Sequence, residues 1–113
     1  MHELSLALEV IRIAEIEAEK IMAKSIQEIS IEVGDLSGVE ADSFKSALEL
    51  LAGDTLLDEA RINIIRSPGK GRCNACDHEF EMNNIMTTCP RCQAFPSQVN
   101  GGREFRVLSL VIE

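Results

Sequence analysis

The sequence predicts an α+β fold in which two helices pack on a small three-stranded sheet, with a second small domain inserted before the last strand. Two observations support this prediction. The spacing of apolar residues switches along the chain between the helical period of 3.6 and the strand period of two. All four cysteines lie between two glycine-rich turns, in a segment that is poor in large apolar side chains. We therefore expect one domain of residues 1–66 and 103–113, and an inserted domain of residues 67–102.

The first helix is predicted from Leu4 to about Lys24. Apolar side chains recur there at three- and four-residue steps, and charged side chains occupy the other positions. The same spacing predicts a second helix from Glu40 to about Ala52, and Gly53 is a suitable stop signal after it.

Three segments alternate apolar and polar residues and are predicted as strands: Ile26–Gly34, Ala60–Ile64 and Arg103–Glu113. The first is followed by turn residues, from Gly34 to Gly38. The second and third strands flank the inserted segment, and we expect them to lie side by side in antiparallel order.

The composition excludes several functions. The chain has 113 residues, a formal net charge of −8 and 4% aromatic residues. This charge repels phosphate backbones and anionic lipids, and the scarcity of aromatic residues argues against base stacking. No apolar run approaches the length of a membrane span, and the first residues lack the pattern of a signal peptide. We expect a cytoplasmic protein with reduced cysteines, and neither nucleic acid nor membrane as a partner.

The cysteines form two Cys-x-x-Cys pairs, Cys73 with Cys76 and Cys89 with Cys92. Two thiolates at this spacing bind one ion from a tight turn, and two such pairs complete a tetrahedral sulfur shell, which predicts structural zinc, Zn2+. Zinc binding, about 10–16 kcal/mol in small modules, would supply the folding free energy that so short a segment lacks. A redox dithiol, disulfides and a rubredoxin-like iron site are the alternatives. His78 is interpreted as an exposed or supporting side chain rather than a ligand.

The first three residues, Met1, His2 and Glu3, can form a second metal site. Because His2 is large, we expect the initiator Met1 to be retained with a free amine. This amine, the backbone nitrogen of His2 and its imidazole Nδ1 suit a square-planar ion such as nickel, Ni2+, or copper. Glu3, or a neighbour such as Glu40 near the start of the second helix, is a candidate fourth donor. Taken alone the motif is weak, because a histidine at this position is usually an ordinary solvated residue.

Together these motifs resemble the HypA/HybF family of hydrogenase nickel-incorporation proteins. The resemblance covers nearly the whole chain in the same order, on residues 1–5, 34–40 with Phe44, 53–57 and the two cysteine pairs. It implies a metallochaperone rather than an enzyme, with a nickel-binding α/β domain and a zinc ribbon. By this resemblance His2 and the Met1 amine hold nickel, Glu3 assists, and Glu40 matches an acidic position near the nickel site.

The resemblance also implies that the four cysteines hold zinc. The sequence departs from the family pattern at Asp77 and Gln93, since the family often has glycine at these positions after the cysteine pairs. The sequence therefore leaves the geometry of these two turns open.

The resemblance further implies partners, namely a HypB-type GTPase, the large subunit of [NiFe]-hydrogenase and, for some members, urease maturation proteins. The chain has no serine–histidine–acid set and no phosphate-binding glycine loop, so we expect nucleotide hydrolysis to belong to a partner. Two alternatives remain: a structural zinc-ribbon adaptor without nickel transfer, and a rubredoxin-like iron electron carrier.

Overall fold

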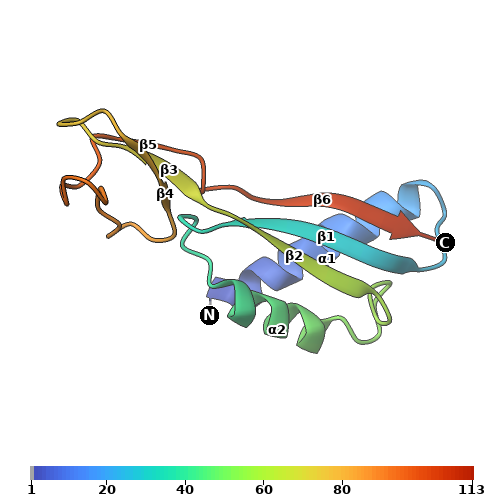
Figure 1. The fold of residues 1–113 in the computed structure, drawn as a ribbon. Helices are drawn as coiled ribbons and strands as arrows, with labels where there is room; N and C mark the ends of the chain where they lie inside the picture. Colours follow the sequence, from blue (N-terminus) through green and yellow to red (C-terminus); the bar gives the residue numbers. More distant parts are fainter. Residues whose placement is uncertain (1) are drawn as a thin grey trace. The chain divides into compact units, whose positions relative to one another are not determined.

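The computed structural model describes residues 2–113. Its elements are α1 (His2–Lys20), β1 (Ile26–Gly34), α2 (Ala41–Leu51), β2 (Arg61–Ser67), β3 (Gly69–Arg72), β4 (Glu79–Met82), β5 (Gln98–Asn100) and β6 (Phe105–Ile112). The strands form two three-stranded sheets, in the orders β2-β1-β6 and β4-β3-β5 (Figure 1). The predicted α+β class is confirmed.

The chain divides into two compact units. The first comprises the segments up to Glu32, Val39–Ile65 and Arg106–Glu113, and the second comprises Val33–Gly38 and Arg66–Phe105. The turn that follows β1, which the sequence analysis groups with the first domain, therefore belongs to the second unit.

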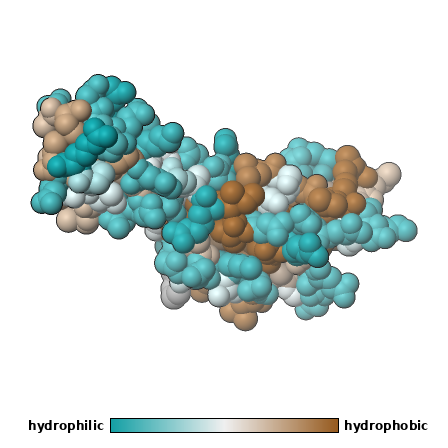
Figure 2. Space-filling view, viewed as in Figure 1, coloured by the Kyte–Doolittle hydropathy of each residue, from teal (hydrophilic) through white to brown (hydrophobic). Residues whose placement is uncertain are grey.

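In the first unit, α1 and α2 pack against each other and cover one face of the sheet, with α1 behind the strands in Figure 1. Strand β1 directs Ile29 and Ile31 into the core, where both are fully buried. The helices contribute buried side chains at helical spacing: Ala7, Val10, Ile11, Ala14, Ala18, Phe44, Ala47 and Leu48. The other face of β1 carries half-buried polar side chains, and Asn63 of β2 donates to Glu28 at 2.8 Å. Figure 2 shows hydrophilic and hydrophobic side chains interspersed over these strands.

The expectation that the two strands flanking the insert are neighbours is wrong, because β1 lies between β2 and β6. Strand β6 runs antiparallel to β1, as shown by hydrogen bonds from Gly34 N to the Glu104 carbonyl and from Lys24 N to the Glu113 carbonyl. The physical reason for this order is burial. The apolar residues of β1 are almost completely buried, whereas the apolar residues of β2 and β6 are half-buried or exposed, as befits edge strands.

Helix α1 ends four residues earlier than predicted, in a Schellman motif. Met22 has φ 56° and its N–H donates to the Glu19 carbonyl, while Ala23 N donates to the Ala18 carbonyl. After α2, the left-handed residue is Asp54 (φ 66°) rather than the predicted stop residue Gly53.

The second unit has its own small core. Its buried members are Cys73, Phe80, Met82 and Cys89, with Leu36 and Val99 packed against them. Gly71 of β3 lies directly under this cluster, since a Cβ there would come within 2.8 Å of the Met82 sulfur and 2.9 Å of the Phe80 ring. Only glycine lets these side chains approach β3 so closely. The core is too small to fold the unit without further support.

Candidate metal centres

The first cysteine pair forms the connection between β3 and β4. Cys73 N donates to the His78 carbonyl at 2.9 Å, and Asp77 N donates to the Cys73 carbonyl at 2.9 Å. Asp77 has φ 60°, a left-handed conformation that glycine adopts more readily than other residues. The chain thus makes a tight turn around the Cys73 and Cys76 sulfur atoms.

The second cysteine pair repeats this turn. Cys89 N donates to the Ala94 carbonyl at 2.8 Å, Gln93 N donates to the Cys89 carbonyl at 2.7 Å, and Gln93 has φ 59°. Cys92 N also points at the Cys89 sulfur, at 3.4 Å. Asp77 and Gln93 therefore share a left-handed backbone conformation that favours glycine, and the two turns have the same geometry.

The four sulfur atoms lie within 4.8 Å of one another, and those of Cys76 and Cys89 are 3.7 Å apart. A tetrahedral zinc ion with Zn–S bonds of about 2.3 Å needs sulfur atoms about 3.8 Å apart. Cys73 and Cys89 are buried, and Cys76 and Cys92 are exposed. The cluster suits structural zinc, and four protein sulfurs leave no coordination position open for a substrate.

Two thiols of this cluster, Cys73 and Cys92, have pKa values shifted in opposite directions. Hydrogen bonds from the backbone of Cys76, and then of Ala75, lower the pKa of Cys73 to about 7. The neighbouring Cys76 sulfur raises the pKa of Cys92 to about 12. Sulfur atoms packed this closely share protons because they cannot all be charged without a cation. A divalent ion held by these four sulfurs would take the place of those protons.

His78 lies beside the cluster without joining it. Among the described residues, the candidate ligand group consists of the four cysteines alone. The His78 ring stacks on Phe80, with ring centroids 6.4 Å apart and 24° between the planes. His78 is half-buried and packs on Phe80 of the small core.

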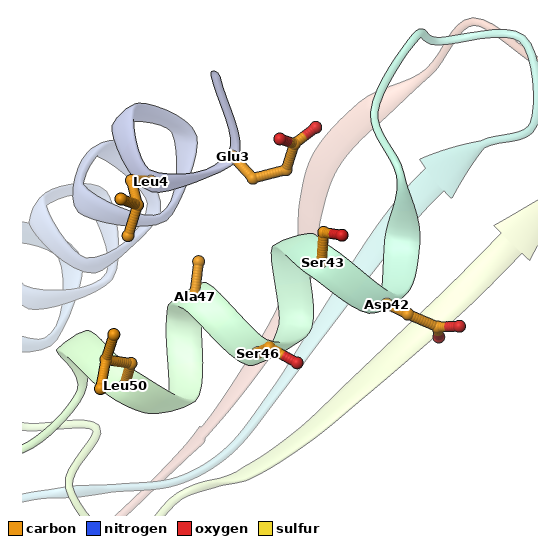
Figure 3. Close-up of a pocket in the computed structure, with 7 residues that line it drawn as sticks. All are labelled: Glu3, Leu4, Asp42, Ser43, Ser46, Ala47 and Leu50. Atoms are coloured by element: carbon orange, nitrogen blue, oxygen red, sulfur yellow. The ribbon is translucent and has the colours of Figure 1, made fainter. Parts of the chain in front are cut away.

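The nickel residues predicted from the sequence lie in the first unit. His2 is the first residue of α1 and is exposed, and Met1 lies outside the described residues. Glu3 is half-buried and lines a groove of about 440 Å³ between α1 and α2, together with Leu4, Asp42, Ser43, Ser46, Ala47 and Leu50. Figure 3 shows the Glu3 side chain extending toward the first turn of α2. The two helices therefore begin at the same end of this unit.

Glu40 is the N-cap of α2. Its carboxylate accepts hydrogen bonds from Ser43 N at 3.0 Å, Asp42 N at 3.2 Å and the Ser43 hydroxyl at 3.1 Å. These bonds hold the carboxylate at the start of α2 and satisfy backbone donors that have no partner within the helix. Sequence reasoning missed this role because glutamate is not among the preferred N-cap residues.

Known proteins resemble this chain over its whole length. The hydrogenase maturation factor HypA of Geobacter metallireducens is 38% identical over 113 residues, which cover 100% of both chains. That of Francisella philomiragia is 36% identical and covers 98% of each. The solution structure of the Ni metallochaperone HypA from Helicobacter pylori matches 97% of this chain and 96% of its own, with a TM-score of 0.65 and 27% identity.

Residues 1–112 match the family described as hydrogenase/urease nickel incorporation, metallochaperone, HypA. Over the part of the chain that the structure describes, neither helix has the length and apolar character needed to cross a membrane. From the matched residues and the agreement in fold, this chain belongs to the HypA family of hydrogenase and urease nickel-incorporation metallochaperones.

Proposed function

We propose that this chain binds Ni2+ at its N-terminus and delivers it for the maturation of [NiFe]-hydrogenase. The observation that carries this proposal is the position of His2, an exposed imidazole on the first residue of α1, in a chain of the HypA family. The site is on the first unit, whereas the four cysteines are in the second. Nickel is thus a cargo with its own donors, which do not include the sulfur atoms that suit zinc.

The nickel donors in this proposal are the Met1 amine, the backbone nitrogen of His2 and its Nδ1. The first N–H groups of a helix have no intrahelical partner, so the His2 nitrogen is available once its proton leaves. Three nitrogens in one plane favour a square-planar ion. Because an amide proton must be lost and the imidazole must be neutral, nickel affinity falls as the pH is lowered.

Glu3 and Glu40 have a supporting role in this proposal. A cation at the starts of two helices meets partial positive charges from both, which disfavour it. The Glu3 side chain extends toward α2, and Glu40 is fixed on α2 by its capping hydrogen bonds. The negative charges of these carboxylates offset the partial positive charges at the two helix starts. Glu3, which follows His2 directly in the chain, is the first candidate for a fourth donor.

The inserted segment, residues 67–102, has a structural role in the proposal. Zn2+ bound by Cys73, Cys76, Cys89 and Cys92 holds the two turns together and is not transferred. The N-terminal metal is the one released, during docking with a HypB-type GTPase and with the hydrogenase large subunit or urease maturation proteins. The chain acts by binding and release in the cytoplasm, and nucleotide hydrolysis belongs to the GTPase.

A His2→Ala variant is expected to lose the high-affinity nickel site, because the imidazole closes one of the two chelate rings. We expect affinity to fall at least about tenfold, since one of three linked nitrogen donors is lost. Isothermal titration of the untagged, zinc-loaded protein measures this change. His78→Ala is the matched control and should bind nickel as the unmodified chain does.

Equal nickel affinity in His2→Ala and the unmodified chain would favour the zinc-ribbon adaptor without nickel transfer. A red protein containing iron in place of zinc would instead favour the rubredoxin-like electron carrier.

A further inference from the structure

Arg72 stands at the base of the first cysteine turn. It is the last residue of β3, and its cross-strand partner is Glu79, the first residue of β4. Its guanidinium donates to Glu79 at 3.2 Å and to Asp77, within the turn, at 2.9 Å. The Arg72 side chain thus spans the base of the turn and contacts Asp77, the residue of the turn that has a left-handed backbone.

The backbone of Arg72 connects the same point to the second cysteine pair. Its carbonyl accepts from Ser97 N at 3.0 Å and from the Ser97 hydroxyl at 3.3 Å. Ser97 follows the second turn and precedes β5, whose residue Gln98 pairs with Arg72. Arg72 therefore connects the first cysteine turn with the segment that follows the second.

The second turn lacks a comparable clamp. Gln93 has the same left-handed backbone as Asp77, yet within residues 2–113 no ion pair joins the segment from Cys89 to Ala94. Among the described residues, the segment is held by backbone hydrogen bonds and by contacts to the Cys89 sulfur, from Cys92 N at 3.4 Å and from the Cys76 sulfur at 3.7 Å. The two halves of the sulfur site are thus alike in backbone and different in support.

We propose that Arg72 is a positioning residue for the zinc site, which holds Asp77 in its left-handed conformation and so keeps Cys73 and Cys76 ready to bind. This inference rests on the proposed zinc site and goes beyond it. Holding a residue other than glycine in this region of backbone space has a free-energy cost, and the two charge-assisted hydrogen bonds of Arg72, one to Asp77 and one to Glu79, offset it in the folded state. A glycine at position 77 would make such a clamp unnecessary, because glycine adopts this conformation without a steric cost.

The positive charge of Arg72 could also favour zinc binding, without any effect on the backbone of Asp77. Zinc with four thiolates carries a charge of about −2, and any nearby cation would stabilise it. Arg91 lies between Cys89 and Cys92 and provides such a charge with no ion pair to the described residues. It therefore serves as the matched control for charge without a clamp.

The test measures zinc affinity by competition with a chromophoric chelator, and the ligand geometry by the visible spectrum of the Co2+-substituted protein. Arg72→Gln should weaken zinc binding about fivefold, a modest effect because the three side chains are partly exposed. Its cobalt spectrum should keep the sulfur charge-transfer bands but shift in the ligand-field region. Arg91→Gln should leave both unchanged.

The decisive comparison is made in an Asp77→Gly background, in which the turn no longer needs the clamp. There, Arg72→Gln should have no further effect on zinc affinity. A loss of the same size in that background, or an equal loss with Arg91→Gln, overturns the proposal and assigns the effect to charge. Unchanged affinity in Arg72→Gln also overturns it, but leaves the zinc site intact. Failure of the unmodified chain to bind zinc or cobalt overturns the zinc site itself.

Discussion

Acetylation of the N-terminal amine is expected to weaken Ni2+ binding at least about hundredfold, because it converts the amine that closes the five-membered chelate ring into an amide that no longer donates its lone pair. Every side chain remains in place, so the change isolates the amine. The protein is acetylated at the α-amine only, and nickel affinity is measured by isothermal titration. Zinc content, measured on the same sample, should not change.

Acetylation is a cleaner test than adding one residue before Met1. A single added residue would place His2 third, behind a new amine and two amides, and this set of four nitrogens also suits square-planar nickel. Unaltered nickel affinity after acetylation would exclude the N-terminal site, whatever the effect of His2→Ala.

The Cys89→Ser variant is expected to lose its zinc and to unfold the second unit while the first stays folded. Cys89 is fully buried, and its sulfur lies 3.7 Å from that of Cys76. Zinc binding contributes about 10–16 kcal/mol in small modules, more than a core of Phe80, Met82 and two cysteines can replace. The first unit has a separate core around Phe44 and should be unaffected.

Hydrogen exchange of backbone amides measures this difference, since it reports opening of each unit separately. Residues 69–82 should lose protection and residues 26–32 should keep it. Thr88→Ser, at the neighbouring position, is the control and should bind one zinc ion. A Cys89→Ser protein that retains zinc and full protection in β3 and β4 would show that the cluster is not what folds this unit.

Local pattern predicted most of the elements of this fold. The bounds of β1 match the prediction, Ile26–Gly34, because its alternation of apolar and polar residues is regular. The end of α1 was not predicted, since its Schellman motif places Met22 where glycine is the usual signal. The order of the strands was also missed. The strand order depends on which strand is buried on its core face and has polar partners on its other face. Both features come from contacts between residues that are distant in sequence.

The candidate sites, like the fold, could be predicted from the sequence only in part. Cysteine spacing alone indicates a four-sulfur site, because two residues between cysteines fix the reach of each turn. It does not indicate that Asp77 and Gln93 can replace glycine, or that Arg72 supports one of them. A signal for Arg72 was present: if residues 73–78 are treated as a hairpin connection, Arg72 and Glu79 become opposite charges on facing positions.

The assignment of nickel to the N-terminus and zinc to the cysteines is tested most directly by X-ray absorption at the nickel and zinc edges of the protein loaded with both metals. The expected nickel spectrum shows a planar set of nitrogen and oxygen neighbours, including one imidazole, and the expected zinc spectrum shows four sulfurs. Sulfur neighbours at nickel, or fewer than four at zinc, would contradict the assignment.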